Sequence, residues 1–307
     1  MTEHRTAAEI VAGLDLRGKL CLVTGVSSGL GAETARVLAG AGAAVVGTAR
    51  DVAKARAAVG DAGVEVGELE LDSLASVRRF ARWFDASHSA LHALVNNAGV
   101  MACPLGRTQD GFERQFGTNH LGHFLLTGLL VPKLLAGAPA RVVCVSSRGH
   151  LLAGVDLDDP NYERSPYSPW EAYGRAKSAN VLFALELDRR LAARGVRANA
   201  LHPGGIRTEL GRHLTPESIQ EMMARFELRG GPIQFKDVAH GAATQVWAAV
   251  SPELDGIGGR YLEDVRIGVP VRGETDSSGY AAHALDPDIA RRLWTLSEKL
   301  VGERFDF

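Results

Sequence analysis

The sequence contains only three cysteines among 307 residues, Cys21, Cys103 and Cys144. Cys21 and Cys144 lie inside apolar, strand-like runs, and an odd number of widely spaced cysteines is not the pattern of a disulfide framework. We therefore expect buried, reduced thiols. The ten histidines are scattered and form no cluster with cysteine at the spacing of metal ligands, so we expect no metal site.

Strong charge and long apolar stretches are also missing. The net charge of −2 provides no basic field for nucleic acid or for an anionic membrane surface. The longest apolar stretch, residues 123–137, is interrupted by Pro132 and Lys133 and is too short to span a bilayer. Residues 1–19 contain no continuous apolar segment of the secretory kind. We expect a cytoplasmic protein with neither a nucleic acid nor a membrane as its partner.

The sequence does contain a regular alternation of strand-like and helix-like patterns. Short apolar runs predict buried strands at residues 19–25, 43–49, 64–71, 91–99, 140–147 and 196–204. Helical periodicity predicts helices at 29–42, 74–87, 108–135 and 169–195, the third capped by Thr108 or Asp110 and the fourth ended by Gly195. Such alternation is typical of an α/β, doubly wound (Rossmann-type) parallel sheet with helices on both faces. No repeat or linker is found, so we expect a single domain over residues 1–307.

Three segments interrupt or follow this alternation. Residues 154–170 are polar and rich in proline, which predicts a long loop. Residues 213–235 suggest short helical segments that form a mobile lid. Apolar residues of this lid would cover a hydrophobic substrate: Leu214, Ile219, Met222, Met223 and Phe226. The pattern weakens in residues 265–307, for which we predict no definite structure.

A glycine-rich turn joins the first predicted strand to the first predicted helix. In TGVSSGLG, residues 24–31, the glycines have the spacing G-x-x-x-G-x-G. Bare backbone at a strand–helix junction lets a pyrophosphate approach the free N–H groups and positive dipole end of the helix. The alternative is a tight turn that only allows close helix–strand packing. Because the glycines fall at such a junction, we predict dinucleotide binding.

Arg50 follows the second predicted strand, where NAD-specific folds place a carboxylate for the ribose hydroxyls. A guanidinium there would bind a 2′-phosphate in a bidentate manner. Asp51 weakens this interpretation, and Ser28 supplies no second positive charge. We predict that NADP(H) is preferred and that NAD(H) remains possible.

Four polar residues fall at predicted strand ends or on the helices that follow: Asn119, Ser147, Tyr173 and Lys177. Tyr173 and Lys177 are four residues apart, which places them on one helix face. Hydride transfer to a carbonyl requires a proton donor, and an ammonium beside a phenol stabilises phenolate and lowers the phenol pKa. A serine hydroxyl can hold the substrate oxygen, and an asparagine amide can link the lysine to water. The alternative for the Tyr/Lys pair alone is a solvated helix surface.

Six motifs occur in the order found in short-chain dehydrogenases/reductases: TGVSSGLG, NNAG, NHLGHF, VSS, YGRAK and HPGGIRT. The resemblance covers roughly residues 16–264, and WEAYGRAKSANVLFALELDRRL most resembles the retinol-dehydrogenase and WW-domain-oxidoreductase branch. It implies that Tyr173 is the general acid/base, that Lys177 activates it and touches the nicotinamide ribose, that Ser147 orients the substrate carbonyl, and that Asn119 supports the relay. Membrane-attached members of that branch carry an N-terminal anchor, which we do not find in residues 1–19, and this argues against a retinoid substrate.

The same resemblance implies a set of cofactor contacts beyond Arg50, Tyr173 and Lys177. Asp72 would contact adenine, residues 97–99 the adenosine ribose, and Pro203, Gly204 and Thr208 the nicotinamide end. In full, the implied contacts are Gly25, Ser27, Ser28, Gly29, Leu30, Gly31, Asp72, Asn97, Ala98, Gly99, Pro203, Gly204, Ile206 and Thr208.

The sequence predicts an NADP(H)-dependent oxidoreductase that interconverts a small hydrophobic ketone or aldehyde and its alcohol. The first alternative is a non-catalytic NADP(H)-binding sensor or scaffold on the same fold. An epimerase or dehydratase is a third reading that fits the glycine spacing less well. By analogy with the family, residues 108–135 and 170–194 would pair across a two-fold axis, giving a homodimer or homotetramer.

Two groups of side chains are expected to serve structure. The histidines at positions 120, 123 and 202 would pack or form hydrogen bonds near strand and helix ends. The phenylalanines at positions 112, 116, 124 and 183 would lie in the core or at a subunit contact.

Overall fold

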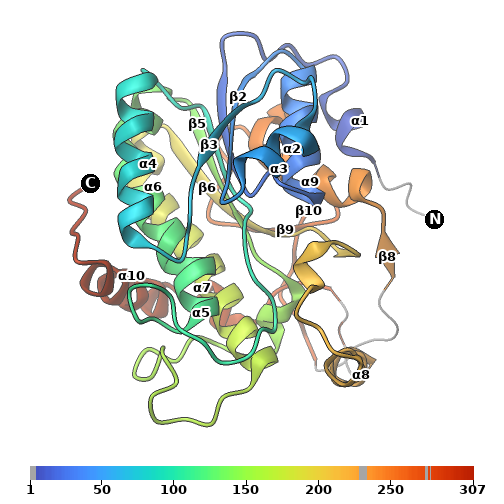
Figure 1. The fold of residues 1–307 in the computed structure, drawn as a ribbon, viewed down its shortest axis with the longest axis vertical. Helices are drawn as coiled ribbons and strands as arrows, with labels where there is room; N and C mark the ends of the chain where they lie inside the picture. Colours follow the sequence, from blue (N-terminus) through green and yellow to red (C-terminus); the bar gives the residue numbers. More distant parts are fainter. Residues whose placement is uncertain (1–4, 228–233, 274–275, 277) are drawn as a thin grey trace.

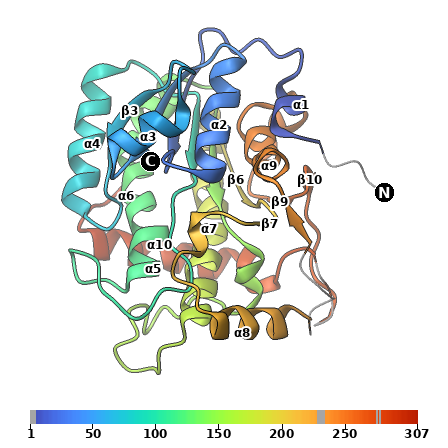
Figure 2. The same cartoon turned by 45° about the vertical axis from the view of Figure 1, so that its right-hand side comes forward.

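A computed structural model describes residues 5–227, 234–273, 276 and 278–307. Its centre is an eight-stranded sheet with the order β10-β9-β6-β5-β4-β1-β2-β3 (Figures 1 and 2). The strands are β1 (Leu20–Thr24), β2 (Ala44–Ala49), β3 (Glu65–Glu68), β4 (Ala93–Asn96), β5 (Ala140–Val145), β6 (Val196–His202), β9 (Tyr261–Glu263) and β10 (Arg266–Ile267). Every pairing from β3 to β9 is parallel, and β10 runs antiparallel to β9.

Helices cover both faces of the sheet, as the alternating sequence pattern predicts. One face carries α1 (Ala7–Val11), α2 (Gly29–Gly40), α3 (Val52–Val59) and α9 (Val238–Val250). The other carries α4 (Leu74–Ser87), α6 (Gly122–Ala136), α7 (Pro169–Leu191) and α10 (Pro287–Val301). Each face has its own hydrophobic core, so strands such as β4 are buried throughout. The predicted doubly wound parallel sheet in a single domain is confirmed.

The helix predicted for residues 108–135 begins later than expected. Thr108 is part of a turn in which its hydroxyl accepts a hydrogen bond from Phe112 N (3.1 Å). The helix is capped instead by Glu113, whose carboxylate accepts hydrogen bonds from the two following N–H groups of α5 (Arg114–Phe116). A π-helical turn, η1 (Gly117–Leu121), then leads into α6. The expected caps Thr108 and Asp110 are therefore wrong, because Gly111, with a φ of +86°, keeps this stretch in a turn.

Other expectations from the sequence can be compared directly with the structure. Gly195 follows α7 and its short 3₁₀ extension with a left-handed φ of +81°, which confirms it as the terminating residue. All three cysteines are free and buried, and burial raises the pKa values of Cys21 and Cys144 to about 12, so these thiols are unreactive. Within the part of the chain that the structure describes, no helix is both long and apolar enough to cross a bilayer.

Residues 265–307, for which the sequence predicts no definite structure, form β10, a short 3₁₀ helix and α10. Helix α10 packs against α7 and the π-helical turn η1 (Figure 1). Trp294 packs edge-on to Phe124 at 4.9 Å between ring centroids, and the guanidinium of Arg190 lies 4.2 Å above the Trp294 ring. Any Cβ on Gly128 would overlap the ring of Phe305, which therefore fills a notch in α6. The C-terminal segment of the same chain therefore covers part of α6 and α7, the helices for which the sequence predicts pairing with a second copy.

The covered face generates a prediction about assembly. We expect the protein to sediment or elute with the mass of one chain, 32.7 kDa, when measured by light scattering. Trp294→Ala should lower the free energy of unfolding by about 3–5 kcal/mol, because it removes a large buried ring from this contact. Exposure of Phe124 and Phe183 should also make that variant associate with rising concentration. A wild-type dimer that Trp294→Ala leaves unchanged would contradict this view of the face.

Candidate active site

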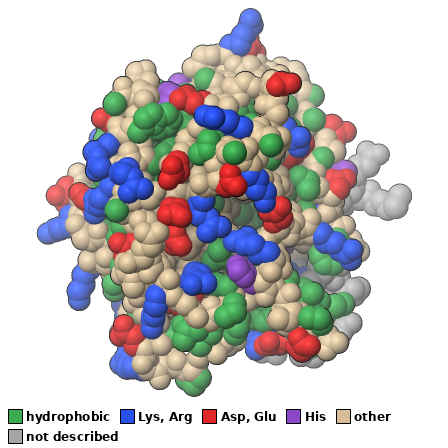
Figure 3. Space-filling view, in the orientation of Figure 1, with side chains coloured by type: hydrophobic (Ala, Val, Ile, Leu, Met, Phe, Trp, Pro, Cys, Tyr) green, Lys and Arg blue, Asp and Glu red, His purple; other side chains and the backbone are tan. Residues whose placement is uncertain are grey.

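Parallel pairing brings the carboxyl ends of β1, β4, β5 and β6 to one edge of the sheet. The chain leaves these strands through the glycine turn, the NNAG segment, Ser146–Ser147 and His202–Pro203. In doubly wound sheets ligands bind at this edge. On the face seen in Figure 3, a hollow has hydrophobic side chains in its depth and both basic and acidic side chains around its mouth.

The glycine turn is built so that backbone approaches backbone. Gly25 has a φ of +77°, and a Cβ there would lie 2.8 Å from Cβ of Ala98. A Cβ on Gly31 would overlap the carbonyl of Gly25. Ser28 is the N-cap of α2 and forms no side-chain cap hydrogen bond, so no hydroxyl closes the first turn of this helix. The turn therefore presents N–H groups to an anion, as a pyrophosphate requires.

The adenosine side of this edge offers an acidic acceptor and a cation. Asp72 Oδ1 is buried and has no hydrogen-bond partner among the described residues, which suits it to accept from an amino group such as that of adenine. Arg50 is exposed at the end of β2, directly before Asp51, the N-cap of α3. The residues present therefore fit a dinucleotide with a phosphate on its adenosine half.

A second cation lies near Arg50 in the sequence and was not identified there. Lys54 forms an ion pair of 2.5 Å with Glu209, whose carboxylate also accepts a hydrogen bond from Ser28. The hydrogen bond from Lys54 is the largest cause that keeps the pKa of Glu209 below its ordinary value. The loop after β6 thus crosses the mouth of the glycine turn and holds Lys54 beside it.

The same loop contains the residues assigned to the nicotinamide end. Thr208 Cγ2 lies 3.1 Å from the position of a Cβ on Gly29, so this loop contacts the glycine turn. Gly204 has a φ of +110°, and the aliphatic chain of Lys236 lies against it. Two other predicted cofactor contacts, Ile206 and Leu30, lie together because both pack on Gly241 of α9. Of the remaining ones, Ser27 is half-buried in the glycine turn and Pro203 is buried.

Tyr173 and Lys177 lie together on the buried face of α7, each 3% exposed. The ammonium of Lys177 donates a hydrogen bond to the carbonyl of Val145 at the end of β5 (2.9 Å) and lies 5.6 Å from the centroid of the Tyr173 ring. Ser147 follows β5 and forms a hydrogen bond with Tyr173. A Cβ on Gly149 would lie 2.8 Å from Cε1 of Tyr173, so the glycine makes room for the ring.

The ionisation of this pair differs from the sequence-based expectation. Burial raises the pKa of Tyr173 to about 12, although the hydrogen bond with Ser147 acts in the opposite direction. Burial also lowers the pKa of Lys177 to about 8. Lys177 was expected to lower the phenol pKa, but desolvation of the hydroxyl is the larger effect here. With its pKa raised in this way, the Tyr173 phenol is protonated at neutral pH and has a proton available to donate.

Asn119 lies in the π-helical turn η1 and is fully buried. Its amide oxygen accepts a hydrogen bond from Val100 N (2.8 Å), and its amide nitrogen donates to Val100 O (2.9 Å). The amide was expected to link Lys177 to water, but it binds the backbone that follows the NNAG segment. Gly99 lies between Asn119 and Lys177. A Cβ at Gly99 would be 2.9 Å from Asn119 Oδ1 and 3.7 Å from Lys177 Nζ.

An apolar wall stands beside Tyr173. Ala102, Trp170 and Tyr173 form a small buried cluster, with the partly buried residues Met101, Leu152, Leu214 and Met222 packed against it. Trp170 was missed by the sequence analysis, although its spacing of three residues from Tyr173 already places both on one helix face. Its ring lies edge-on to Tyr173 at 6.2 Å between centroids.

The predicted lid is built around α8 (Pro216–Glu227), which lies away from the sheet in Figure 2. The indole N–H of Trp170 donates to Ser218 O at 3.0 Å, which fixes the start of α8 beside the apolar wall. Leu214 and Met222 face that wall, whereas Ile219 and Met223 are exposed. The side chain of Phe226 and residues 228–233 lie outside the described part of the chain.

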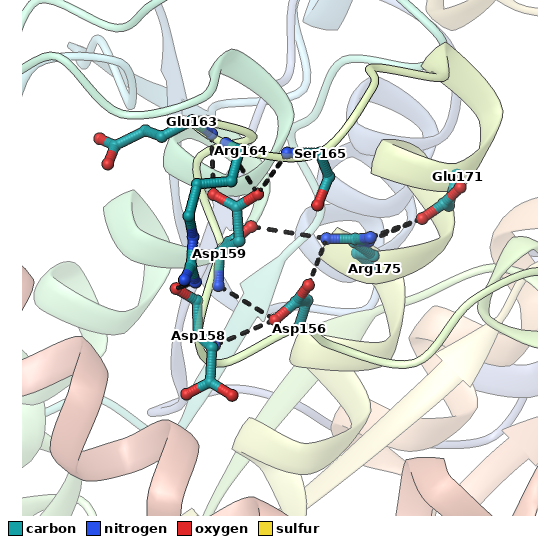
Figure 4. Close-up of polar contacts among 8 residues, drawn as sticks. All are labelled: Asp156, Asp158, Asp159, Glu163, Arg164, Ser165, Glu171 and Arg175. Atoms are coloured by element: carbon teal, nitrogen blue, oxygen red, sulfur yellow. Dashed lines mark hydrogen bonds and ion pairs between the residues drawn. The ribbon is translucent and has the colours of Figure 1, made fainter.

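The long loop before α7 is held by two of its carboxylates, buried Asp159 and partly exposed Asp156 (Figure 4). Burial alone would raise the pKa of Asp159, but N–H groups of residues 163–165 donate to its carboxylate and hold that pKa well below the ordinary value. Arg175 of α7 joins Asp156 of this loop to Glu171 on its own helix. The loop therefore anchors the helix turn that carries Tyr173.

Burial keeps three of the histidines uncharged. Burial lowers the pKa values of His120 and His202 to about 3 and that of His123 to about 4. His120 bonds to Ser297 of α10 (2.8 Å) and packs among aromatic rings, as expected for a structural residue. In the described part of the chain, no group of His, Cys, Asp and Glu side chains is arranged to hold a metal ion.

Comparison with known proteins identifies the family. A family model for short chain dehydrogenases matches residues 19–218. The chain is 41% identical to the short-chain dehydrogenase/reductase prx1 of Penicillium roqueforti, covering 97% of this chain and 90% of that protein. It is 40% identical to human retinol dehydrogenase 14, covering 94% and 87%.

Solved structures agree with these relatives. A crystal structure of a Mycobacterium paratuberculosis protein matches with a TM-score of 0.74 and 39% identity, covering 97% of this chain and 98% of that one. A short chain dehydrogenase of Burkholderia cenocepacia, solved in complex with NADP, matches with a TM-score of 0.64 and 26% identity, covering 81% and 96%. The order of motifs, the fold and these relatives agree, and the chain belongs to the short-chain dehydrogenase/reductase family of NAD(P)-dependent oxidoreductases.

Proposed function

We propose that the protein is an NADP(H)-dependent oxidoreductase that interconverts a hydrophobic ketone or aldehyde and the corresponding alcohol. The observation that carries this proposal is the group of buried Tyr173 and Lys177 with half-buried Ser147, which lies at the same sheet edge as the glycine turn. A phenol, an ammonium and a hydroxyl in this arrangement can hold a carbonyl oxygen and deliver a proton to it.

Tyr173 is the proposed general acid in the reductive direction. Its raised pKa keeps the phenol protonated, so it can donate to a carbonyl oxygen that gains negative charge. The Ser147 hydroxyl would hold the same oxygen. Lys177 would stabilise the resulting phenolate through its charge, in a buried site where Coulomb interactions are strong. Bound NADPH supplies the hydride.

NADP(H) is preferred over NAD(H) in this proposal because of the charges at the adenosine end. Arg50 can bind a 2′-phosphate in a bidentate manner, and Lys54 provides a second cation nearby once it exchanges Glu209 for phosphate. The NADP complex of the Burkholderia cenocepacia relative supports the same choice. The other proposed contacts are Asp72 at the adenine, residues 97–99 at the ribose, and residues 203–208 at the nicotinamide.

The substrate class follows from the wall beside Tyr173. The wall offers the aromatic and aliphatic surface of Trp170, Met101, Leu214 and Met222. The ammonium of Lys177 already donates a hydrogen bond to the carbonyl of Val145. A hydrophobic carbonyl compound or alcohol fits such a wall better than a charged one. Free, buried thiols support a reducing compartment, so we propose the cytoplasm as the location.

The first test is a panel of apolar ketones, aldehydes and alcohols assayed with NADPH and NADH in parallel. Tyr173→Phe keeps the ring but removes the proton donor, so turnover should fall by roughly 10²- to 10⁴-fold. NADPH binding, measured by fluorescence titration, should change little. Wild-type rates in Tyr173→Phe would overturn the mechanism, and tight NADPH binding without turnover of any compound would indicate the non-catalytic sensor instead.

The lowered pKa of Lys177 predicts a pH limit. The ammonium is charged below a pKa of about 8 and neutral above it. The kcat for carbonyl reduction should therefore fall as the pH rises through about 8, measured at saturating NADPH. In Lys177→Arg the guanidinium stays charged, so the remaining activity should lack this decline. If kcat declined identically in the wild type and in Lys177→Arg, the decline would have to come from the titration of another group.

Cofactor choice is tested at Arg50. Removing its charge-assisted hydrogen bonds in Arg50→Ala should raise the KM for NADPH by about ten- to a hundredfold and leave the KM for NADH nearly unchanged. Arg56→Ala is the matched control, because it removes an exposed arginine from the same segment. Equal effects on both cofactors, or an equal effect of the control, would argue against a 2′-phosphate site at Arg50.

A further inference from the structure

His123 lies at the junction between the π-helical turn η1 and the end of β1. It is the second residue of α6 and is 2% exposed. Its Nδ1 lies 3.0 Å from the main-chain oxygen of Asn119, and its Nε2 lies 2.9 Å from Oγ1 of Thr24. One imidazole thus connects the turn that carries Asn119 to the strand that begins the glycine turn.

The partners of His123 determine which ring nitrogen carries the proton. A carbonyl oxygen only accepts hydrogen bonds, so Nδ1 must donate to Asn119. In a neutral ring Nε2 is then an acceptor, and Thr24 must donate its hydroxyl proton to it. The same hydroxyl oxygen accepts hydrogen bonds from Asn97 N (2.9 Å) and Ala98 N (3.0 Å). The carbonyl of Val95 is a second acceptor within reach of the Thr24 hydroxyl, but at 3.4 Å it is farther away than Nε2 of His123 at 2.9 Å. With the hydroxyl donating to Nε2, every member of this chain of hydrogen bonds is satisfied.

The charge state of the ring agrees with this arrangement. Burial lowers the pKa of His123 to about 4, with the hydrogen bond to Asn119 acting against it and the charge of Lys177 acting with it. The imidazole is therefore neutral across the physiological range. A charged ring would need an acceptor at Nε2, whereas the Thr24 hydroxyl already accepts from two N–H groups.

The segment that follows β4 is held at both ends by groups that His123 joins. Thr24 binds its start through Asn97 and Ala98, and the amide of Asn119 binds its end through Val100. Gly99 lies between, beside both Asn119 Oδ1 and Lys177 Nζ. The π turn is defined by a hydrogen bond from Gly122 N to Gly117 O, and π turns inside helices are frequent at functional sites.

We propose that His123 is a positioning residue. It fixes where Asn119 and Lys177 lie relative to residues 97–99, the segment proposed to bind the cofactor. It touches neither substrate nor cofactor and acts through two separate hydrogen bonds. The bond to Asn119 positions the π turn, and the bond to Thr24 positions Asn97 and Ala98. The predicted effect on catalysis, through Asn119, rests on the proposed function. The predicted effect on cofactor affinity, through Thr24, requires only that the protein binds NADPH.

The two hydrogen bonds can be separated by substitution. An asparagine amide places its nitrogen near the position of Nδ1, so His123→Asn keeps the bond to Asn119 and loses the bond to Thr24. A glutamine places its amide oxygen near Nε2, so His123→Gln keeps the bond to Thr24 and loses the bond to Asn119. His123→Leu loses both. His120→Asn removes another buried imidazole from the adjoining π-helical turn η1 and serves as the control for a general loss of packing.

The experiment measures NADPH affinity by fluorescence titration and kcat at saturating NADPH for each variant. His123→Asn should weaken NADPH binding about tenfold with kcat near wild type, and His123→Gln should lower kcat about tenfold with unchanged NADPH affinity. His120→Asn should change neither quantity selectively. If His123→Asn and His123→Gln lost NADPH affinity and kcat to the same extent, His123 would serve only in packing and the proposal would be overturned.

A measurement on the unaltered protein covers the case in which the variants fail to fold. Nitrogen-15 NMR of labelled histidine should identify His123 as a neutral ring with the proton on Nδ1 from about pH 6 to 8. A proton on Nε2 instead would overturn the proposed hydrogen-bond chain. If the wild type reduced no carbonyl compound, the proposed function would fail, while NADPH affinity and the NMR signature would still decide the role of His123.

Discussion

The ammonium of Lys177 donates to the carbonyl of Val145 at the carboxyl end of β5, and both groups are buried. Placing this charge away from water is costly unless it is hydrogen-bonded, so the contact fixes how α7 lies on the sheet. Tyr173, one turn earlier, is then placed beside Ser147, which follows the same strand. Gly149 leaves the space for its ring, and the loop anchored by Asp159 and Arg175 holds the beginning of the helix.

Much of this arrangement could be predicted from the sequence because it depends on local patterns. Buried parallel strands are short, continuous apolar runs, and the glycine turn falls where a run ends. The spacing of Tyr173 and Lys177 sets their common helix face without further information. For the same reason Trp170 could have been found, since it lies one turn before Tyr173 on that face.

The expectations that failed depend on three-dimensional context. The turn at residues 108–113 has helical periodicity, but Glu113 supplies a better cap than Thr108 once its carboxylate is buried. The sign of the Tyr173 pKa shift depends on desolvation, which no spacing rule reports. The packing of the C-terminal segment on α6, for which the sequence predicts no definite structure, depends on contacts between residues far apart in sequence, such as Gly128 and Phe305. Lys54 became visible as a second cation only through its partner Glu209.

Trp170 has one further consequence, which concerns observation rather than catalysis. Its indole N–H is bonded to Ser218 at the start of α8, while its ring faces Tyr173 in a buried cluster. The emission of an indole shifts in wavelength when it gains or loses water and a hydrogen-bond acceptor. Any movement of α8 away from the sheet edge would change both for Trp170. The chain therefore carries, next to its proposed proton donor, an intrinsic optical reporter of whether that segment is in place.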